Sequence, residues 1–151
     1  MKILANNKKA VFNYEVLKKF QAGLVLKGWE VKSIKTGRVS LKESYVKIMD
    51  GVPIIEKMHI SEWPGMHKDT DPDFDRDRVL LLHQQEINNL ISGTKIKGQT
   101  IVPLQLYLDK NKIKLEIALA RGKKKYDKRA RLKEKDQIRQ IDRDLKHLGY
   151  N

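Results

Sequence analysis

The stretch that decides the fold class runs from residue 45 to residue 60 and reads YVKIMDGVPIIEKMHI. Two runs of β-branched, aliphatic and aromatic residues flank the dipeptide Asp50-Gly51, and Asp-Gly is a preferred type I′ turn between antiparallel strands. The pattern predicts a β-hairpin with strands over 45–49 and 52–60. Because Pro53 cannot donate to a strand ladder, we expect the second strand to start at an edge or a bulge.

A second hairpin is predicted further along the chain, with strands over residues 100–108 and 113–120 and a turn at 109–112. In its second strand apolar residues at 113, 115, 117 and 119 alternate with Lys114, Glu116 and Ala118. Alternation of this kind indicates a strand with one buried face.

The segment before the first hairpin predicts one helix and one strand. Residues 14–22 are expected to form a short helix, with Asn13 as N-cap and Gly23 just past its end. Residues 24–33 are expected to form a strand, and the shift of the apolar alternation across Gly28 suggests a bulge there.

Between the hairpins, residues 61–78 predict a long acidic loop, and residues 80–91 predict a helix that Gly93 ends. The aspartates of the loop do not fit a calcium-binding loop. If Asp71 is placed first, Arg76 falls at the glycine position and Leu82 at the position of the bidentate glutamate.

These segments give at least five short strands and two helices, which makes the chain mainly β with embedded helices. Antiparallel strands of this size must close or hide their edges. We therefore expect a small closed β-barrel of the oligonucleotide-binding kind, the OB fold.

At 151 residues the chain is expected to hold one domain over 1–121 and a basic tail over 122–151. The formal net charge is +13, and residues 121–151 contain 12 Lys/Arg against 5 Asp/Glu. A cationic segment with few apolar groups is expected to be disordered when free and to bind a polyanion, with nucleic acid as the first candidate.

Within the tail, apolar residues recur at helical spacing at Ile138, Ile141, Leu145 and Leu148. This narrow seam predicts a helix that forms only when the tail is bound, because so short a helix is marginal in water. The alternative is an ordinary terminal helix that docks on the barrel.

Composition and motifs set aside several other classes. The chain has no cysteine, so it has neither a disulfide framework nor a thiolate metal site, and no apolar run reaches the length of a secretory signal or a membrane span. P-loop, Gly-x-Ser-x-Gly and His-Glu-x-x-His motifs are absent from the sequence. We therefore expect no catalytic residue, metal or cofactor.

Two basic segments are candidates for RNA contact. Residues 123–129 combine lysines and Arg129 with Tyr126, and residues 6–13, expected to be an extended arm, combine Lys8 and Lys9 with Phe12. Cations beside aromatic rings suit phosphates and unstacked bases. The plainer interpretations are a solvated charge run and aromatic rings that belong to the core.

The motifs together resemble the bacterial SsrA-binding protein family, also called the small protein B family, over nearly the whole chain. The match rests on two specific runs, Gly28-Trp29-Glu30-Val31-Lys32-Ser33 and, about ninety residues later, Gly122-Lys123-Lys124-Lys125-Tyr126-Asp127-Lys128-Arg129. Further matching segments lie at 7–10, 22–27, 44–46 and 76–83.

The resemblance implies an OB-type barrel and a bacterial, cytoplasmic, monomeric protein without chemistry of its own. Members of this family bind the tRNA-like end of transfer-messenger RNA (tmRNA) and deliver it to the empty A site of stalled ribosomes in trans-translation, where the barrel mimics half of a tRNA. The tail is then expected to reach the decoding centre and to fold in the vacant mRNA channel.

The resemblance also implies site residues. An RNA face is expected to include Asn7, Lys8, Lys9, Phe12, Glu30, Lys32, Tyr45 and Leu81. The decoding role is expected to fall to Gly122, Lys123, Lys124, Tyr126, Asp127, Lys128, Arg129 and Leu145. Position 21, usually a glutamate in this family and an expected RNA contact, is Gln21 here.

Two other classes stay open at this point. The chain could be a different structural RNA-binding protein, such as a ribosomal or ribosome-assembly protein. A nucleic-acid enzyme is the third class, and it needs a site that the sequence does not display.

Overall fold

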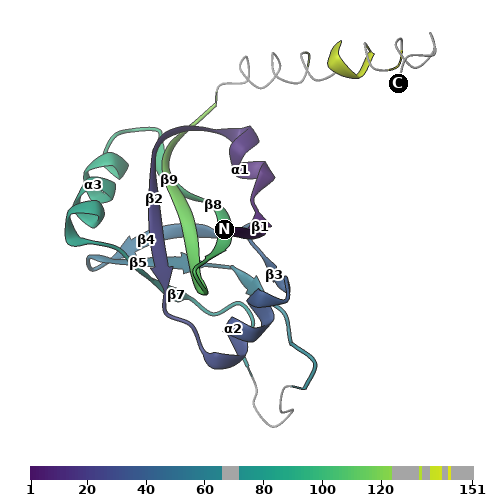
Figure 1. Ribbon diagram of the computed structural model, residues 1–151. Helices are drawn as coiled ribbons and strands as arrows, with labels where there is room; N and C mark the ends of the chain where they lie inside the picture. The colour runs from purple at the N-terminus through teal and green to yellow at the C-terminus, as the bar shows by residue number, and fades with distance from the viewer. Residues whose placement is uncertain (66–71, 124–132, 134–136, 141–142, 144–151) are drawn as a thin grey trace. The chain divides into compact units, whose positions relative to one another are not determined.

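The computed structural model describes residues 1–65, 72–123, 133, 137–140 and 143. The chain divides into two compact units, Met1–Arg121 and Gly122–Asn151. Figure 1 shows the first unit as a curled sheet with three helices on its outside. In the second unit the described residues 133, 137–140 and 143 are helical. The predicted disorder of the free tail concerns mostly residues that lie outside this description.

Seven strands form one sheet, and two short strands form another. The strands of the large sheet follow the order β1-β8-β9-β2-β7-β5-β4, and β4 at one end packs against β8 near the other, which closes the sheet into a barrel. The elements are β1 (Lys2–Asn6), α1 (Lys8–Asn13), β2 (Tyr14–Leu24), α2 (Gly28–Lys35), β3 (Val39–Ser40), β4 (Tyr45–Met49), β5 (Val52–Glu56), β6 (His59–Ile60), β7 (Arg78–Leu81), α3 (Gln84–Thr94), β8 (Gln99–Asp109) and β9 (Lys112–Gly122).

Both predicted hairpins are confirmed, but the strand predicted over 52–60 ends at Glu56, and His59–Ile60 forms β6 of the small sheet. Strands β4 and β5 pair from Tyr45 opposite Glu56 to Met49 opposite Val52, around a turn whose residues Asp50 and Gly51 have φ angles of 50° and 77°. Two positive φ angles are what a type I′ turn requires. Strands β8 and β9 pair along their length around a turn at Lys110-Asn111, where both φ angles are again positive.

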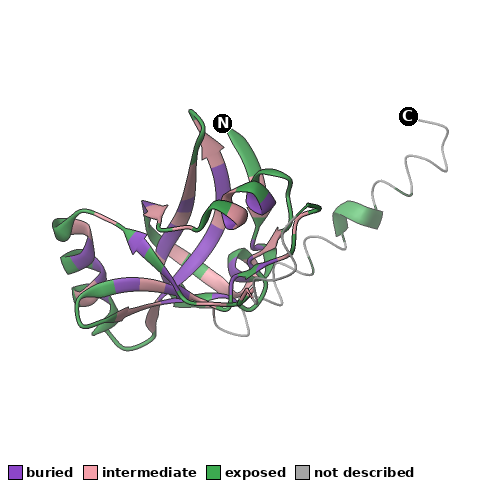
Figure 2. Ribbon diagram, turned by 90° about the horizontal axis from the view of Figure 1, so that it is seen from below, coloured by how far each residue is buried: buried purple, intermediate pink, exposed green. Residues whose placement is uncertain are grey.

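The interior of the barrel is apolar and joins all parts of the first unit. Figure 2 shows the buried residues, in purple, along the strands and on the inner sides of the helices. The main core contains Phe20, Ala22, Ile34, Leu41, Val46, Ile55, Met58, Ile60, Leu80, Leu90, Ile101, Leu106, Leu115 and Ile117. Each fully buried aliphatic side chain of this kind contributes about 1.5–3 kcal/mol relative to its exposed state.

The prediction that β9 has one buried face was incomplete. Leu115 and Ile117 do face the main core, but Ala118 and Ala120 on the opposite face are fully buried as well. They pack in a second cluster with Ala10 of α1. Because the alanine side chains are small, they leave room for α1 to cover this face of β9. The alternation of apolar and polar residues along the strand does not indicate that this second face is buried.

The helix and strand predicted before the first hairpin were wrong. Residues 14–24 form β2, and Phe20 and Ala22 reach the core at strand spacing. Gly23 is a strand residue paired with Leu81, where an added Cβ would lie 3.3 Å from the Leu81 Cβ. The glycine therefore allows a close approach of β2 and β7 and does not end a helix.

The strand predicted over residues 24–33 is largely α2 in the structure. Glu30, Ser33 and Ile34 are its buried residues, and their spacing is helical. Gly28 is the first residue of this helix, with no bulge around it. The N-terminal arm predicted over 6–13 is likewise helical and forms α1.

The predicted helix at 80–91 begins too early. Leu80 and Leu81 belong to β7, and α3 starts at Gln84 and runs to Thr94. Gly93 lies inside this helix, where an added Cβ would lie 2.4 Å from Leu119 Cδ2 on β9. This glycine therefore serves the close packing of α3 on the barrel.

Candidate nucleic-acid interface

Asn7 fixes the start of α1 and so decides where two lysines lie. Its carboxamide oxygen accepts a hydrogen bond from the Ala10 N–H at 3.3 Å, and its Nδ2 donates to the Pro103 carbonyl at 2.9 Å. The side chain is buried. Asn7 therefore anchors α1 to β8, and its side chain is held by these two bonds beneath the surface that α1 presents.

Lys8 and Lys9 follow this anchor and are exposed. Together with Lys42 they line a hollow of about 380 Å³ beside α1. Lys9 also lines a neighbouring hollow of about 210 Å³ together with Asn7 and Tyr45. The structure thus brings three of the predicted site residues to one place, with one cation, Lys9, beside the aromatic ring of Tyr45. Phe12 is half-buried on α1 and lines neither hollow.

Tyr45 is held in place by its cross-strand partner. Its hydroxyl donates to the Glu56 carboxylate, which also pairs with Lys47, and Lys57 Nζ lies 5.9 Å from the centre of the Tyr45 ring. The hydrogen bond to Glu56 raises the pKa of the Tyr45 phenol, and Lys47 and Tyr45 together lower the pKa of Glu56. Tyr45 as a whole remains 40% exposed, so an incoming base can reach it.

Glu30, predicted on the RNA face, is instead fully buried at the centre of an ion cluster. Its carboxylate accepts hydrogen bonds from the Lys27 N–H at 2.7 Å, from Arg78 Nε at 2.5 Å and from Arg76. Burial raises the pKa of Glu30, but the bonds from Arg76, Lys27 and Arg78 outweigh it and lower the pKa below its ordinary value. We therefore correct the RNA-contact prediction for Glu30.

Arg78 is the partner that makes this cluster structural. Its guanidinium is fully buried and also donates to the carbonyl oxygens of Met58 and Phe74, the latter at 3.1 Å. The cluster therefore ties α2, the segment after β5 and the end of the acidic loop to β7. A charged group satisfied this completely costs several kcal/mol to disturb.

Lys32 lies near this cluster along α2, and it is exposed. Its ammonium lies 4.7 Å from the centre of the Trp63 ring, within the range of a cation–π contact. The cation remains at the surface, as the prediction requires.

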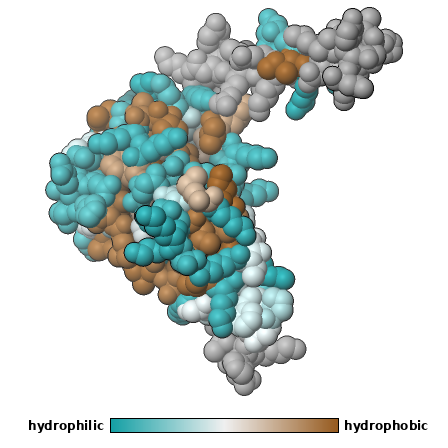
Figure 3. Space-filling view, viewed as in Figure 1, coloured by the Kyte–Doolittle hydropathy of each residue, from teal (hydrophilic) through white to brown (hydrophobic). Residues whose placement is uncertain are grey.

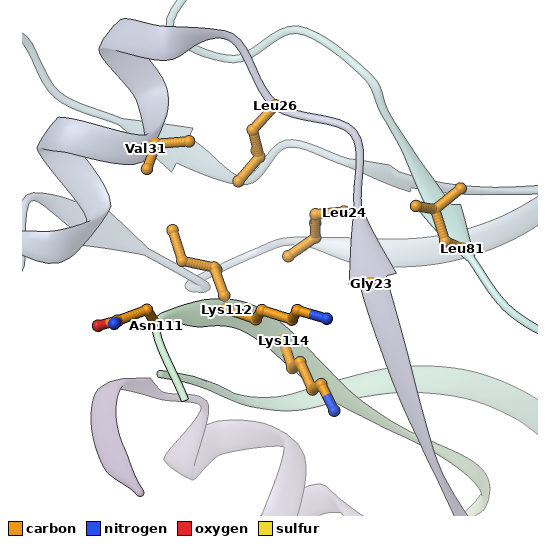
Figure 4. A pocket seen from close by; sticks show the side chains of 9 residues that line it. Gly23, Leu24, Leu26, Val31, Leu81, Asn111, Lys112 and Lys114 are labelled. Atoms are coloured by element: carbon orange, nitrogen blue, oxygen red, sulfur yellow. The ribbon is translucent and has the colours of Figure 1, made fainter. Parts of the chain in front are cut away.

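Leu81 occupies a different place from Lys9 and Tyr45. It is 56% exposed at the end of β7 and borders a cavity of about 350 Å³, here called the Leu81 pocket (Figure 4). The predicted RNA residues of the first unit therefore divide between the surroundings of α1, the α2 surface and this pocket.

The tail residues are described only in part. Gly122 ends β9 and is exposed, and Lys123 is half-buried. The other predicted tail residues, which are Lys124, Tyr126, Asp127, Lys128, Arg129 and Leu145, lie outside the described residues. Ile138 of the predicted apolar seam is 54% exposed.

Several neighbours of the predicted residues were missed, namely Lys42, Glu56, Lys57, Lys112 and Lys114. One signal was present in the sequence: the Asp50-Gly51 turn sets Tyr45 opposite Glu56. Charged and polar side chains cover most of the face seen in Figure 3, with apolar surface between them.

In the described part of the chain, no group of three or more His, Cys, Asp or Glu side chains could hold a metal ion. None of the helices described there is long and apolar enough to cross a membrane.

A closed antiparallel barrel that presents lysines beside an exposed aromatic ring belongs to the class of small oligonucleotide-binding β proteins. The model of the SmpB protein family matches residues 4–147, and the chain belongs to that family.

Relatives and one solved structure agree with this assignment. The SsrA-binding protein of a Nitratiruptor species is 52% identical over 136 residues, which cover 89% of this chain and 91% of the relative. The SsrA-binding protein of Thiobacillus denitrificans is 49% identical, and the match covers 93% of this chain and 94% of the relative.

The solved structure described as "tmRNA-SmpB: a journey to the center of the bacterial ribosome" contains a similar chain. The match has a TM-score of 0.65 and 36% identity, and it covers 80% of this chain and 84% of the other.

Proposed function

We propose that this protein binds the tRNA-like domain of tmRNA and delivers it to the A site of stalled ribosomes in the bacterial cytoplasm, so that the nascent peptide is tagged and the ribosome is released. The observation that carries the proposal is the similarity, along four fifths of the chain, to a chain of the solved structure whose description names tmRNA-SmpB and the bacterial ribosome. The curated relatives named as SsrA-binding proteins support it.

Within the first unit, we assign RNA contact to Lys8, Lys9, Lys32 and Tyr45, with Leu81 at a separate position. All five side chains are exposed. The lysines supply cations for phosphates, and Tyr45 supplies a ring for an unstacked base. Asn7 and Glu30 support this surface from beneath, the first through α1 and the second through α2.

We assign a second role to the tail. Residues 121–151 carry a large excess of Lys and Arg, which suits the phosphates of ribosomal RNA. A basic segment that occupies the mRNA channel binds only where mRNA is absent, and that exclusion gives selectivity for stalled ribosomes. In this role we place Gly122, Lys123 and the basic run that follows.

Binding of the full chain to the tRNA-like fragment of tmRNA, titrated with salt, tests the first role. The comparison is a perfect RNA duplex with the same number of phosphates. Preference for the fragment at physiological salt supports the proposal, whereas equal affinities and equal salt slopes leave only nonspecific charge attraction.

The variant Lys9→Gln sharpens this test. If Lys9 contacts a phosphate of the fragment, its loss decreases the magnitude of the salt slope by about 0.7–0.9. Lys95→Gln, on an exposed lysine after α3, is the matched control.

Truncation after Gly122 tests the second role: we expect retained affinity for the fragment and loss of peptide tagging on stalled ribosomes.

A further inference from the structure

Trp63 lies at the start of the acidic loop and contacts Lys32, to which we assign RNA contact. The centre of its ring is 4.7 Å from the Lys32 ammonium, the shortest of the three cation–π contacts in the described part of the chain. Among aromatic side chains, indole attracts a cation most strongly. Lys32 is exposed and Trp63 is half-buried, so the cation lies at the surface and the ring is partly covered.

The backbone holds the segment that carries Trp63 beside α2. The Ser61 N–H donates to the Arg38 carbonyl at 2.9 Å, and the Arg38 N–H in turn donates to the Ser33 carbonyl of α2 at 2.9 Å. Trp63 follows Ser61 by two residues. Its position is therefore tied through the backbone to the end of the helix that carries Lys32.

Gly65 allows the chain to turn close to the Trp63 ring. Its φ angle is 98°, and an added Cβ would lie 3.1 Å from Trp63 Cζ3 and 3.3 Å from Cη2. A side chain at this position would be strained and would press on the ring. The acidic loop therefore begins with a turn whose backbone confines the indole.

Holding Lys32 with a ring has a different electrostatic consequence from holding it with a carboxylate. Within the described residues Lys32 forms no ion pair, whereas Lys19, Lys47 and Lys114 each pair with a carboxylate. A carboxylate neutralises an ammonium and competes with a phosphate for it. An aromatic face orients the ammonium without neutralising it. Lys32 therefore keeps its full charge for an incoming anion.

We propose that Trp63 is a positioning residue for RNA binding. Its ring holds the Lys32 ammonium in one place at the surface of α2, where the ammonium meets a phosphate of the bound RNA. An unrestrained lysine loses its side-chain freedom only on binding, which weakens the affinity. Residues 61–65 thereby belong to the binding site although they supply no cation. This inference rests on the proposed function.

The ring current of Trp63 gives a direct readout of the contact. Protons above an aromatic face are shifted upfield. We therefore expect the Lys32 Hε resonances of the full chain to lie upfield of those of Lys35, an exposed lysine on the same helix. The difference is expected to disappear in Trp63→Leu, and Lys32→Gln assigns the resonances. Lys32 and Lys35 resonances at the same position would overturn the proposal.

Binding measurements test whether the contact serves RNA recognition. Trp63→Leu keeps every charge, so we expect its affinity for an RNA duplex, which follows the number of charges, to be unchanged. For the tRNA-like fragment we expect a loss of about two- to fivefold, the strength of a cation–π contact at an exposed site. Equal losses for fragment and duplex would overturn the proposal.

Trp63→Phe is the conservative control. It keeps an aromatic face, and Trp63 Nε1 has no hydrogen-bond partner among the described residues that the change would remove. We expect this variant to lose less than about twofold in affinity for the fragment. A loss as large as that of Trp63→Leu would overturn the proposal, because an aromatic face would then not be sufficient.

A double-mutant cycle shows whether Trp63 acts through Lys32. In the Lys32→Gln background, we expect Trp63→Leu to cause no further loss of affinity for the fragment. In the Lys35→Gln background, which lacks the same charge at an exposed position of α2, the loss is expected to equal that in the unaltered protein. Equal losses in both backgrounds would overturn the proposal. Thermal unfolding checks that all variants are folded.

The results separate this inference from the proposed function. If the unaltered protein prefers the fragment over the duplex and Trp63→Leu binds the fragment with full affinity, the positioning role fails and the proposed function stands. If the unaltered protein shows no preference, the proposed function fails. The positioning role then fails with it, even where the ring current shows that Lys32 lies over the ring.

Discussion

The buried cluster around Glu30 and the open surface around Tyr45 are built on the same motif, a carboxylate that bridges two partners. Glu30 joins Arg76 and Arg78, and Glu56 joins Tyr45 and Lys47. Glu30 and its partner Arg78 are both fully buried, whereas the Glu56 side chain is 12% exposed and its partners Tyr45 and Lys47 are each 40% exposed. The first arrangement therefore stabilises the fold, and the second leaves exposed the Tyr45 ring, to which we assign RNA contact.

Removing the buried carboxylate is expected to have the largest effect. Glu30→Gln keeps the shape of the side chain but leaves the Arg78 guanidinium buried without its counter-charge. Breaking a buried ion pair in this way costs about 3–5 kcal/mol. Urea denaturation at neutral pH measures the loss in the free energy of unfolding.

Glu56→Gln is the matched control, because it makes the same chemical change at the open surface. We expect a clearly smaller loss of stability there. Equal losses in the two variants would show that burial does not distinguish the two carboxylates, and the contrast between the two regions would not hold.

The same contrast predicts a pH dependence. Burial raises the pKa of Glu30, but bonds from Arg76, Lys27 and Arg78 outweigh burial, and the pKa in the folded protein lies below its ordinary value. A group with a lowered folded pKa contributes stability that is fully present above its unfolded pKa, about 4.3 for glutamate. That contribution is lost as the pH falls through the folded pKa.

We therefore expect the stability difference between the unaltered protein and Glu30→Gln to be constant near neutral pH and to shrink below about pH 4. Urea denaturation at a series of pH values measures it. A difference that grows toward acid pH would mean that Glu30 is not held as a carboxylate.

Much of the fold followed from local patterns, and the errors have a common cause. The two hairpins were predicted because a turn and two flanking strands lie within one short stretch, as at Asp50-Gly51. The segment 14–33 was assigned with helix and strand interchanged. Val16, Leu17 and Phe20 together fit the helical period, and only Val16 and Phe20 also fit the strand period. The strand is selected by pairing with β7 and β9, far away in sequence.

The candidate site was predicted less well for a similar reason. The family resemblance indicated Glu30 and Tyr45 together, but it does not distinguish a residue that holds the surface from one that lies on it. The burial of Glu30 depends on Arg76 and Arg78, which follow it by 46 and 48 positions. Glu56, in contrast, could have been found from the hairpin register alone.

The open surface can be tested through the Tyr45 ring. We expect Tyr45→Ala to weaken binding of the tRNA-like fragment by roughly tenfold, since stacking of a base on an aromatic ring is commonly of that strength. Tyr45→Phe keeps the ring and is expected to bind almost as tightly. Equal losses in both variants would place the hydroxyl, and not the ring, in contact with RNA.

The phenol of Tyr45 also reports on its positioning partner. Its pKa is raised by the hydrogen bond to the Glu56 carboxylate. In Glu56→Gln we expect the pKa of Tyr45 to fall toward its ordinary value, which ultraviolet titration of the phenolate measures. An unchanged titration would mean that Glu56 does not hold the ring in solution.

The smallest effect is expected at Gln21, the position where the family resemblance implies a glutamate. Gln21 Nε2 donates to Glu116 at 3.2 Å, and its carboxamide oxygen accepts from the Tyr107 hydroxyl. Gln21→Glu removes that donor and places two carboxylates side by side, while Lys19, 3.7 Å from Glu116, offsets part of the repulsion. We expect a loss of at most about 1 kcal/mol in the free energy of unfolding, larger at low salt than at high salt.

The same variant tests whether position 21 belongs with the residues that hold the surface or with those that meet RNA. Because the Gln21 side chain is engaged by Tyr107 and Glu116, we expect Gln21→Glu to change affinity for the tRNA-like fragment by less than about twofold, within the range of a surface charge change. A larger change, measured at a salt concentration where both proteins are equally stable, would move position 21 to the RNA-contacting group with Tyr45. An unchanged affinity with a salt-dependent stability loss would place it with Asn7 and Glu30, as a residue that acts through its neighbours.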